Sequence, residues 1–185
     1  MRTKASFTLF EILLVLSLLL IILMMTVPVR NFLGNFYLKS EVERLEVFYR
    51  YLQQLAIASG QTQTLVFDLQ QNACSCQKSK TEKLMLLLEN GIKFGFMPGV
   101  FGPPTKPTRK IEGPISIDRS IAVEAKNNAA LDNLSIKFLP SGKITSGSVY
   151  FIDRQNKNMG ALTCSPSRVS YLRRYIYNGM NWIGL

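Results

Sequence analysis

Histidine is absent from all 185 residues of this chain. Without it the chain lacks the commonest general base and the commonest metal ligand, which argues against hydrolytic and zinc chemistry. A glycine-rich phosphate cradle is also missing, because Gly91, Gly95 and Gly99 match neither a P-loop nor a dinucleotide fingerprint. The aspartates and glutamates form no recognisable acid–base pair. We therefore predict no catalytic residue, no metal site and no cofactor, and we expect that the protein is not an enzyme.

Cysteine is scarce and occurs only at Cys74, Cys76 and Cys164. The C-x-C pair is a poor zinc site in a chain without histidine. In an oxidising compartment, Cys164 could form a disulfide with Cys74 or Cys76. Buried free thiols are the alternative, because free cysteine packs as a small hydrophobe. The sequence leaves both pairings and the free state open.

Acidic residues number 12 against 22 basic ones, a net charge of +10. The clearest basic cluster lies in the C-terminal tail, where Arg168, Arg173 and Arg174 alternate with tyrosines and Trp182. Cations beside aromatic rings suit a phosphate backbone. A final strand with an exposed basic face and a core-facing aromatic face explains the same pattern. We favour the strand, so nucleic acid is not the expected partner, and the three arginines remain a candidate contact patch.

A long apolar run near the N-terminus indicates the class of protein. From Phe7 to Val29 the only charged residue is Glu11. As a helix rising about 1.5 Å per residue, this stretch can cross a hydrocarbon core of roughly 30 Å. A basic leader, residues 1–6, precedes it, so the N-terminus is expected in the cytoplasm. A cleaved secretory signal would instead end in a small-residue site, which residues 24–28 do not provide.

Glu11 separates a plain membrane anchor from a more specific interpretation, because a carboxylate in an apolar run is costly without a partner. The segment Ser6-Phe7-Thr8-Leu9-Phe10-Glu11 resembles the cleavage and N-methylation motif of the type IV pilin-like family. The resemblance implies that a prepilin peptidase cuts between Ser6 and Phe7 and methylates Phe7. It implies that Glu11 pairs with the N-terminal amine of a neighbouring subunit. It also implies that Pro28 loosens or kinks the helix during assembly.

The helix is expected to continue to about Ser59, where Gly60 is a natural stop. Residues 7–29 would be its transmembrane half and residues 30–60 its amphipathic half. The amphipathic half carries one apolar stripe at steps of four and three, which we expect to dock on the protein's own sheet: Leu38, Val42, Leu45, Tyr49, Leu52 and Ala56. Glu46 and Arg50 lie four residues apart and can pair on an exposed side.

Residues 61–185 are predicted to form a β-rich periplasmic head. Alternating apolar and polar residues, or short apolar runs, predict strands at 63–69, 84–89, 92–97, 115–117, 121–125, 134–139, 148–153, 161–164 and 168–172. Prolines in 98–107 predict a loop, and residues 140–143 have turn chemistry. The predicted fold class is therefore α+β, a long N-terminal transmembrane helix packed on a C-terminal antiparallel sheet.

The order of elements further resembles the H-type minor pseudopilins of type II secretion, the GspH/FimT-like group. The residues that carry this resemblance are the helix end at 52–61, the strand at 64–68, the turn at 138–142 and the strands at 147–152 and 161–169. It implies a structural subunit at or near the tip of a secretion pseudopilus, anchored in the bacterial inner membrane. The implied partners are other pseudopilins or pilins, the prepilin peptidase and the inner-membrane assembly platform.

Two other interpretations stay open at this point. The chain could be a minor pilin of a type IV or competence pilus, where some relatives contact DNA. It could also be a membrane-anchored periplasmic domain whose head binds a ligand or catalyses a reaction.

Overall fold

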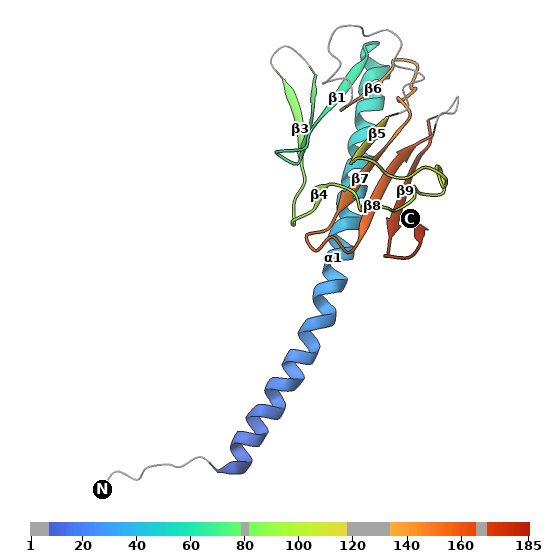
Figure 1. The fold of residues 1–185 in the computed structure, drawn as a ribbon. Coiled ribbons are helices and arrows are strands. Elements are labelled where there is room, and N and C mark those ends of the chain that lie inside the picture. Colours follow the sequence, from blue (N-terminus) through green and yellow to red (C-terminus); the bar gives the residue numbers. More distant parts are fainter. Residues whose placement is uncertain (1–7, 79–81, 118–133, 166–169) are drawn as a thin grey trace.

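A single long helix carries the rest of the described fold (Figure 1). The computed structural model describes residues 8–78, 82–117, 134–165 and 170–185, without the side chains of 25–33. Helix α1 runs from Leu9 to Ser59 over 51 residues. Thr8 caps its N-terminus, and Gly60 ends it in the left-handed conformation with a φ of 66°. The predicted stop at Gly60 is confirmed, because only glycine adopts this φ without strain.

The described residues contain no helix that is both long and apolar enough to cross a membrane. The predicted transmembrane half, 7–29, includes Phe7 and the side chains of 25–29, which lie outside the described part of the chain. The membrane span therefore stays a prediction.

Two antiparallel sheets form the head. The first has the order β3-β2-β1-β6 and the second the order β10-β9-β8-β7-β4, with β5 also paired to β7. The strands of the first sheet are β1 (Gln63–Asp68), β2 (Ala73–Gln77), β3 (Lys83–Leu87) and β6 (Ser135–Phe138). Those of the second are β4 (Lys93–Phe94), β5 (Ile115–Ile117), β7 (Gly147–Ile152), β8 (Met159–Cys164), β9 (Leu172–Tyr177) and β10 (Trp182–Gly184). Every pairing in the described residues is antiparallel, which confirms the predicted α+β class.

Both sheets pack on the C-terminal half of α1 (Figure 1). The predicted stripe is confirmed, since all six of its side chains are buried: Leu38, Val42, Leu45, Tyr49, Leu52 and Ala56. Tyr49 meets Phe138 edge to face at 5.3 Å between ring centroids, and Leu65, Phe67 and Ile136 complete the core from the first sheet.

A second, smaller core lies beneath the proline-containing loop. Ile111, Tyr150, Met159, Ala161 and Tyr175 are buried together, and Phe96, Met97 and Val100 of the loop pack against them with Trp182. The indole Nε1 of Trp182 donates a hydrogen bond of 2.9 Å to the Phe101 carbonyl, which ties the C-terminal hairpin to the loop. The loop therefore acts as a cover for the second sheet.

Most strand predictions are confirmed within a residue or two, with the following exceptions. The Cys-x-Cys segment forms β2 and residues 182–184 form β10, and neither strand was expected. Only two residues of the predicted strand 92–97 pair, as β4. β9 runs from Leu172 to Tyr177 and shares only Leu172 with the predicted strand 168–172. Residues 168 and 169 and the predicted strand 121–125 lie outside the described residues.

Candidate functional site

Thr8 and Glu11 form a reciprocal cap at the start of α1. The backbone N–H of Thr8 donates to Glu11 Oε2 at 2.9 Å, and the Thr8 hydroxyl donates to the same oxygen at 3.0 Å. The backbone N–H of Glu11 donates in return to Thr8 Oγ1 at 3.3 Å. Such a capping box satisfies N–H groups that have no partner within the helix. The Glu11 carboxylate is therefore held at the helix terminus, beside the predicted cleavage site at Ser6 and Phe7, both outside the described residues.

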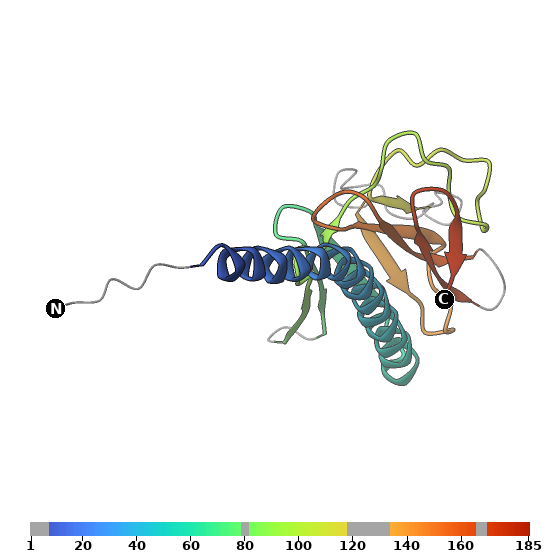
Figure 2. The ribbon, with the colours of Figure 1, turned by 90° about the horizontal axis from the view of Figure 1, so that it is seen from below.

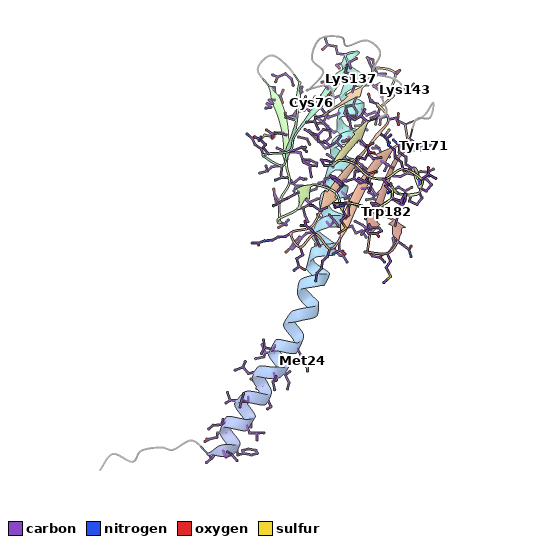
Figure 3. The ribbon with its side chains drawn as sticks, in the orientation of Figure 1. Met24, Cys76, Lys137, Lys143, Tyr171 and Trp182 are labelled. Atoms are coloured by element: carbon purple, nitrogen blue, oxygen red, sulfur yellow. The ribbon has the colours of Figure 1, made fainter. Side chains whose placement is uncertain are left out.

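The N-terminal part of α1 extends away from the head without cover (Figure 3). All large apolar side chains from Leu9 to Met24 are at least 51% exposed. Burying one such side chain is worth about 1.5–3 kcal/mol, so this surface has a large driving force to be covered by lipid or by another helix. Its apolar residues surround the helix, unlike the single stripe of the docked half. Such a pattern is typical of a helix that is buried on all sides.

Pro28 lies inside α1, and the backbone remains helical from Leu9 to Ser59. Figure 2 shows the helix changing direction between its free half and the half that meets the head. The side chain of Pro28 is outside the described set, so its predicted role in assembly stays a prediction.

The structure describes two of the three arginines of the candidate contact patch, Arg173 and Arg174. Arg174 points toward α1, where its Nη1 lies 2.8 Å from Glu43 Oε1 and its Nε lies 3.0 Å from Glu46 Oε2. Arg173, its neighbour in β9, is exposed, because successive residues of a strand face opposite sides. Arg168 lies outside the described residues. Arg173 and Arg174 thus lie on opposite faces of β9, and Arg174 is paired with carboxylates. The contact patch of three arginines stays a prediction, because Arg168 is not described.

The ion pair between Glu46 and Arg50 is present at 2.7 Å; the Arg50 side chain is exposed as predicted, but the Glu46 side chain is not. Glu46 is buried because β9 crosses over it and brings Arg174 to its second oxygen. One carboxylate therefore bridges two guanidinium groups. Sequence reasoning could not find the ion pairs of Arg174 with α1, since Arg174 and Glu43 are 131 residues apart.

The aromatic residues of the tail also differ from the prediction. Tyr175 is buried against the loop-covered side of the second sheet and not against the helix, and Tyr177 and Trp182 pack beside it. Tyr171 is 58% exposed at the margin of the head (Figure 3). The side of β9 toward the helix instead carries Arg174 and Ile176, and Ile176 belongs to the main core.

All three cysteines are free thiols buried in the main core. This confirms the free-thiol alternative. Burial raises the pKa of Cys74 to about 12 and that of Cys164 to about 11, from an ordinary value of 9.0. Burial also raises the pKa of Cys76. These thiols are poor nucleophiles, since only the thiolate reacts.

Within the described residues, no group of three or more potential ligands could hold a metal ion. The described residues do provide a surface for association, the exposed apolar side chains from Leu9 to Met24. The described architecture combines a helix that is free and apolar at one end with a double-sheet head docked at the other.

Comparison with known proteins finds likeness in structure but not in sequence. No family model and no curated protein sequence matches the chain. The solved structures similar to it include two of the minor pseudopilin EpsH from the type II secretion system of Vibrio cholerae. The first is 13% identical with a TM-score of 0.45, over 73% of this chain and 94% of that one. The second is 15% identical with a TM-score of 0.46, over 76% of this chain and 94% of that one.

The likeness to these structures concerns the fold. Both are minor pseudopilins of a type II secretion system.

Proposed function

We propose that this chain is a minor pseudopilin, a structural subunit of a type II secretion pseudopilus. The observation that carries the proposal is the division of α1 into two halves. One half packs its apolar stripe against the protein's own sheets, and the other presents apolar side chains from Leu9 to Met24 on all sides. A helix of this kind joins its subunit to a membrane before assembly and to neighbouring helices after it.

The N-terminal residues support a processing step. Cleavage between Ser6 and Phe7 by a prepilin peptidase would place a new positive amine one residue before the capping box. The carboxylate of Glu11, which Thr8 holds at the helix start, is then available to the amine of a neighbouring subunit. Pairing neutralises both charges within an apolar layer, where a lone carboxylate is costly.

The proposed setting is the bacterial inner membrane, with residues 7–29 as the anchor and the head in the periplasm. Arg2 and Lys4 in the leader support a cytoplasmic N-terminus. The partners we propose are other pseudopilins and the inner-membrane assembly platform, with the subunit at or near the fibre tip. The role is assembly and not catalysis, which agrees with a chain that contains no histidine.

Photo-crosslinking from the free half of α1 tests this proposal. Leu16 is 57% exposed, so a photoreactive phenylalanine analogue at this position should report what covers the helix. In cells that carry a complete type II system, we expect adducts with other pilin-like subunits. The matched control is the same probe in a Glu11→Ala chain, where these adducts should disappear while membrane insertion persists. Adducts with lipid alone in the unmodified chain would contradict the proposal.

A further inference from the structure

The edge of the first sheet at β3 is unoccupied in the described part of the chain. β3 pairs with β2 on one side and is the terminal strand of its sheet, at the outer margin of the head (Figure 1). Edge strands present unpaired N–H and C=O groups to any extended chain that approaches. This edge is also apolar, because Met85 and Leu87 on its outer face are 62% and 47% exposed.

The printed hydrogen bonds show which backbone groups of β3 face outward. Leu88 N–H donates to the Asn72 carbonyl, and Lys78 N–H donates to the Glu82 carbonyl, in the same antiparallel register. Hydrogen-bonded and non-bonded pairs alternate along such a ladder. Leu84 and Leu86 therefore bond to β2. The N–H and C=O groups of Lys83, Met85 and Leu87 point to the open edge.

A groove lies beside this edge on the helix side of the sheet. It has a volume of about 490 Å³, a mostly apolar lining, and these lining residues: Ser40, Glu43, Arg44, Val47, Phe48, Tyr51 and Leu86. Six of the seven belong to α1, and Leu86 is the contribution of β3. Val47 is 62% exposed and Tyr51 is 42% exposed, so this side of the helix has no cover in the described residues. One further strand beside β3 would therefore be needed to cover this side of the helix.

The free edge of β3 and the groove are adjacent, so a single added strand would contact both. A strand paired to β3 would direct alternate side chains over Val47, Phe48 and Tyr51, and the others outward beside Met85. Backbone hydrogen bonds at such an edge provide affinity, and the groove selects the side chains. Lys83 at one end of the edge forms no ion pair among the described residues, so it favours an acidic neighbour.

We propose that β3 binds an extended segment of another protein by strand addition, with apolar residues at alternate positions and a carboxylate beside Lys83. This surface is separate from the free half of α1 and goes beyond the pseudopilin role. A second copy of this chain is a less suitable occupant. Antiparallel pairing of two β3 edges with both grooves on one face would reverse one α1 against the other, so both N-terminal halves could not enter one membrane.

A labelled peptide tests the proposal with the full chain in lipid nanodiscs. The probe is a seven-residue peptide that alternates valine and threonine and carries one glutamate near an end. Its matched control is the same peptide with alternate amides N-methylated, which keeps the side chains and removes the edge donors. We expect the parent peptide to bind and the N-methylated peptide to bind at least about tenfold more weakly, because the backbone bonds carry affinity.

Variants at Met85 distinguish the contribution of its backbone N–H to peptide affinity from that of its side chain. Met85→Pro removes one outward N–H without touching the bonds to β2, a position where edge strands tolerate proline. Met85→Ala shortens the same side chain and keeps the N–H. We expect the proline variant to lose about tenfold in affinity and the alanine variant to stay within about twofold. A peptide with lysine in place of glutamate should bind more weakly to the unmodified chain and more tightly to Lys83→Glu.

Three results would overturn the proposal. The first is no binding of the parent peptide, and the second is equal binding of the N-methylated peptide, which would mean simple apolar adhesion. The third is a dimer of the chain seen by light scattering and lost in Met85→Pro, which would make a second copy the occupant. The comparison of the two peptides uses the unmodified chain, so it holds even where Met85→Pro fails to fold. Leu16 crosslinks are independent of all these measurements, so failure here leaves the pseudopilin proposal intact.

Discussion

A Cβ atom placed on Gly160 would lie 2.7 Å from Cγ2 of Val42, so β8 meets α1 through bare backbone at this point. Two side-chain atoms of Leu38 would lie 3.4 Å from the same Cβ. Val42 and Leu38 are both fully buried members of the helix stripe. Gly160 therefore sets how closely the head docks on the helix.

Gly160→Ala should destabilise the head by about 1–3 kcal/mol, the usual cost of overpacking a core. The measurement is chemical unfolding of the full chain in detergent, followed by near-ultraviolet circular dichroism. Gly184→Ala is the matched control, because its Cβ would meet Tyr175 at an ordinary 3.9 Å. We expect the control to change stability by less than about 0.5 kcal/mol. Equal effects of the two substitutions would contradict close docking at Gly160.

Arg174→Ala should cost more than Arg173→Ala, although the two residues are neighbours in β9. Removing Arg174, whose side chain is 25% exposed, leaves the buried carboxylate of Glu46 with only Arg50. We expect a loss of about 1–2 kcal/mol for Arg174→Ala and less than about 0.5 kcal/mol for exposed Arg173→Ala. The same unfolding experiment gives both values. A larger loss at Arg173 would mean that the ion pairs with α1 are not what fixes β9.

Neither arginine should support tight DNA binding. In a salt titration of DNA binding, we expect weak association at low salt only, as for any basic protein. Tight binding at physiological salt that disappears in the Arg173→Ala, Arg174→Ala double variant would instead favour a competence pilin.

The buried thiols should be unreactive in the folded chain. At pH 8 we expect a disulfide-exchange reagent to modify none of the three cysteines before unfolding and all three after it. The raised pKa values of Cys74 and Cys164 also predict how the stability of the fold depends on pH. The folded state holds these protons more tightly than the unfolded state, so stability is intact below about pH 9 and falls as pH rises from about 9 toward 12. Cys74→Ala should reduce this slope, and an unchanged slope would contradict the assignment.

Glu11→Gln separates the charge of Glu11 from its capping role. Glutamine keeps an oxygen that can accept from Thr8, so the helix start should survive, while the negative charge is lost. We expect normal membrane insertion and a yield of subunit crosslinks from Leu16 that falls at least about tenfold, the equivalent of ~1.4 kcal/mol. Thr8→Ala is the converse control, since it removes the hydroxyl that caps the helix and keeps the charge of Glu11. Normal crosslinking in Glu11→Gln would rule out charge pairing.

The sequence predicts the helix well because its signals are local. The stripe from Leu38 to Ala56 has the helical period, and Gly60 is a conformational stop, so both follow from a few neighbouring residues. Alternation along single strands likewise predicted β1, β6 and β7 to within about a residue or two. β2 was missed because Ala73-Cys74-Ser75-Cys76 has weak strand propensity and depends on its pairing with β1 and β3.

The candidate sites that were missed depend on contacts distant in sequence. The pairing of Arg174 with Glu43 and Glu46 requires β9 to cross α1, and no local pattern encodes that crossing. The groove beside β3 is equally hidden, because it needs the helix residues Val47 and Tyr51 and the sheet residue Leu86 at one place. The alternation of arginines and tyrosines favoured a strand with its aromatic face toward the core, but it did not show that these aromatic residues belong to a second core beneath the loop.

The mature N-terminus of the protein tests the central claim most directly. Mass spectrometry of the chain purified from cells with an active prepilin peptidase should find a polypeptide that begins at N-methylated Phe7. The same chain from cells without the peptidase should begin with the leader. A chain that retains Met1 and the residues up to Ser6 in the presence of the peptidase would contradict the pseudopilin account.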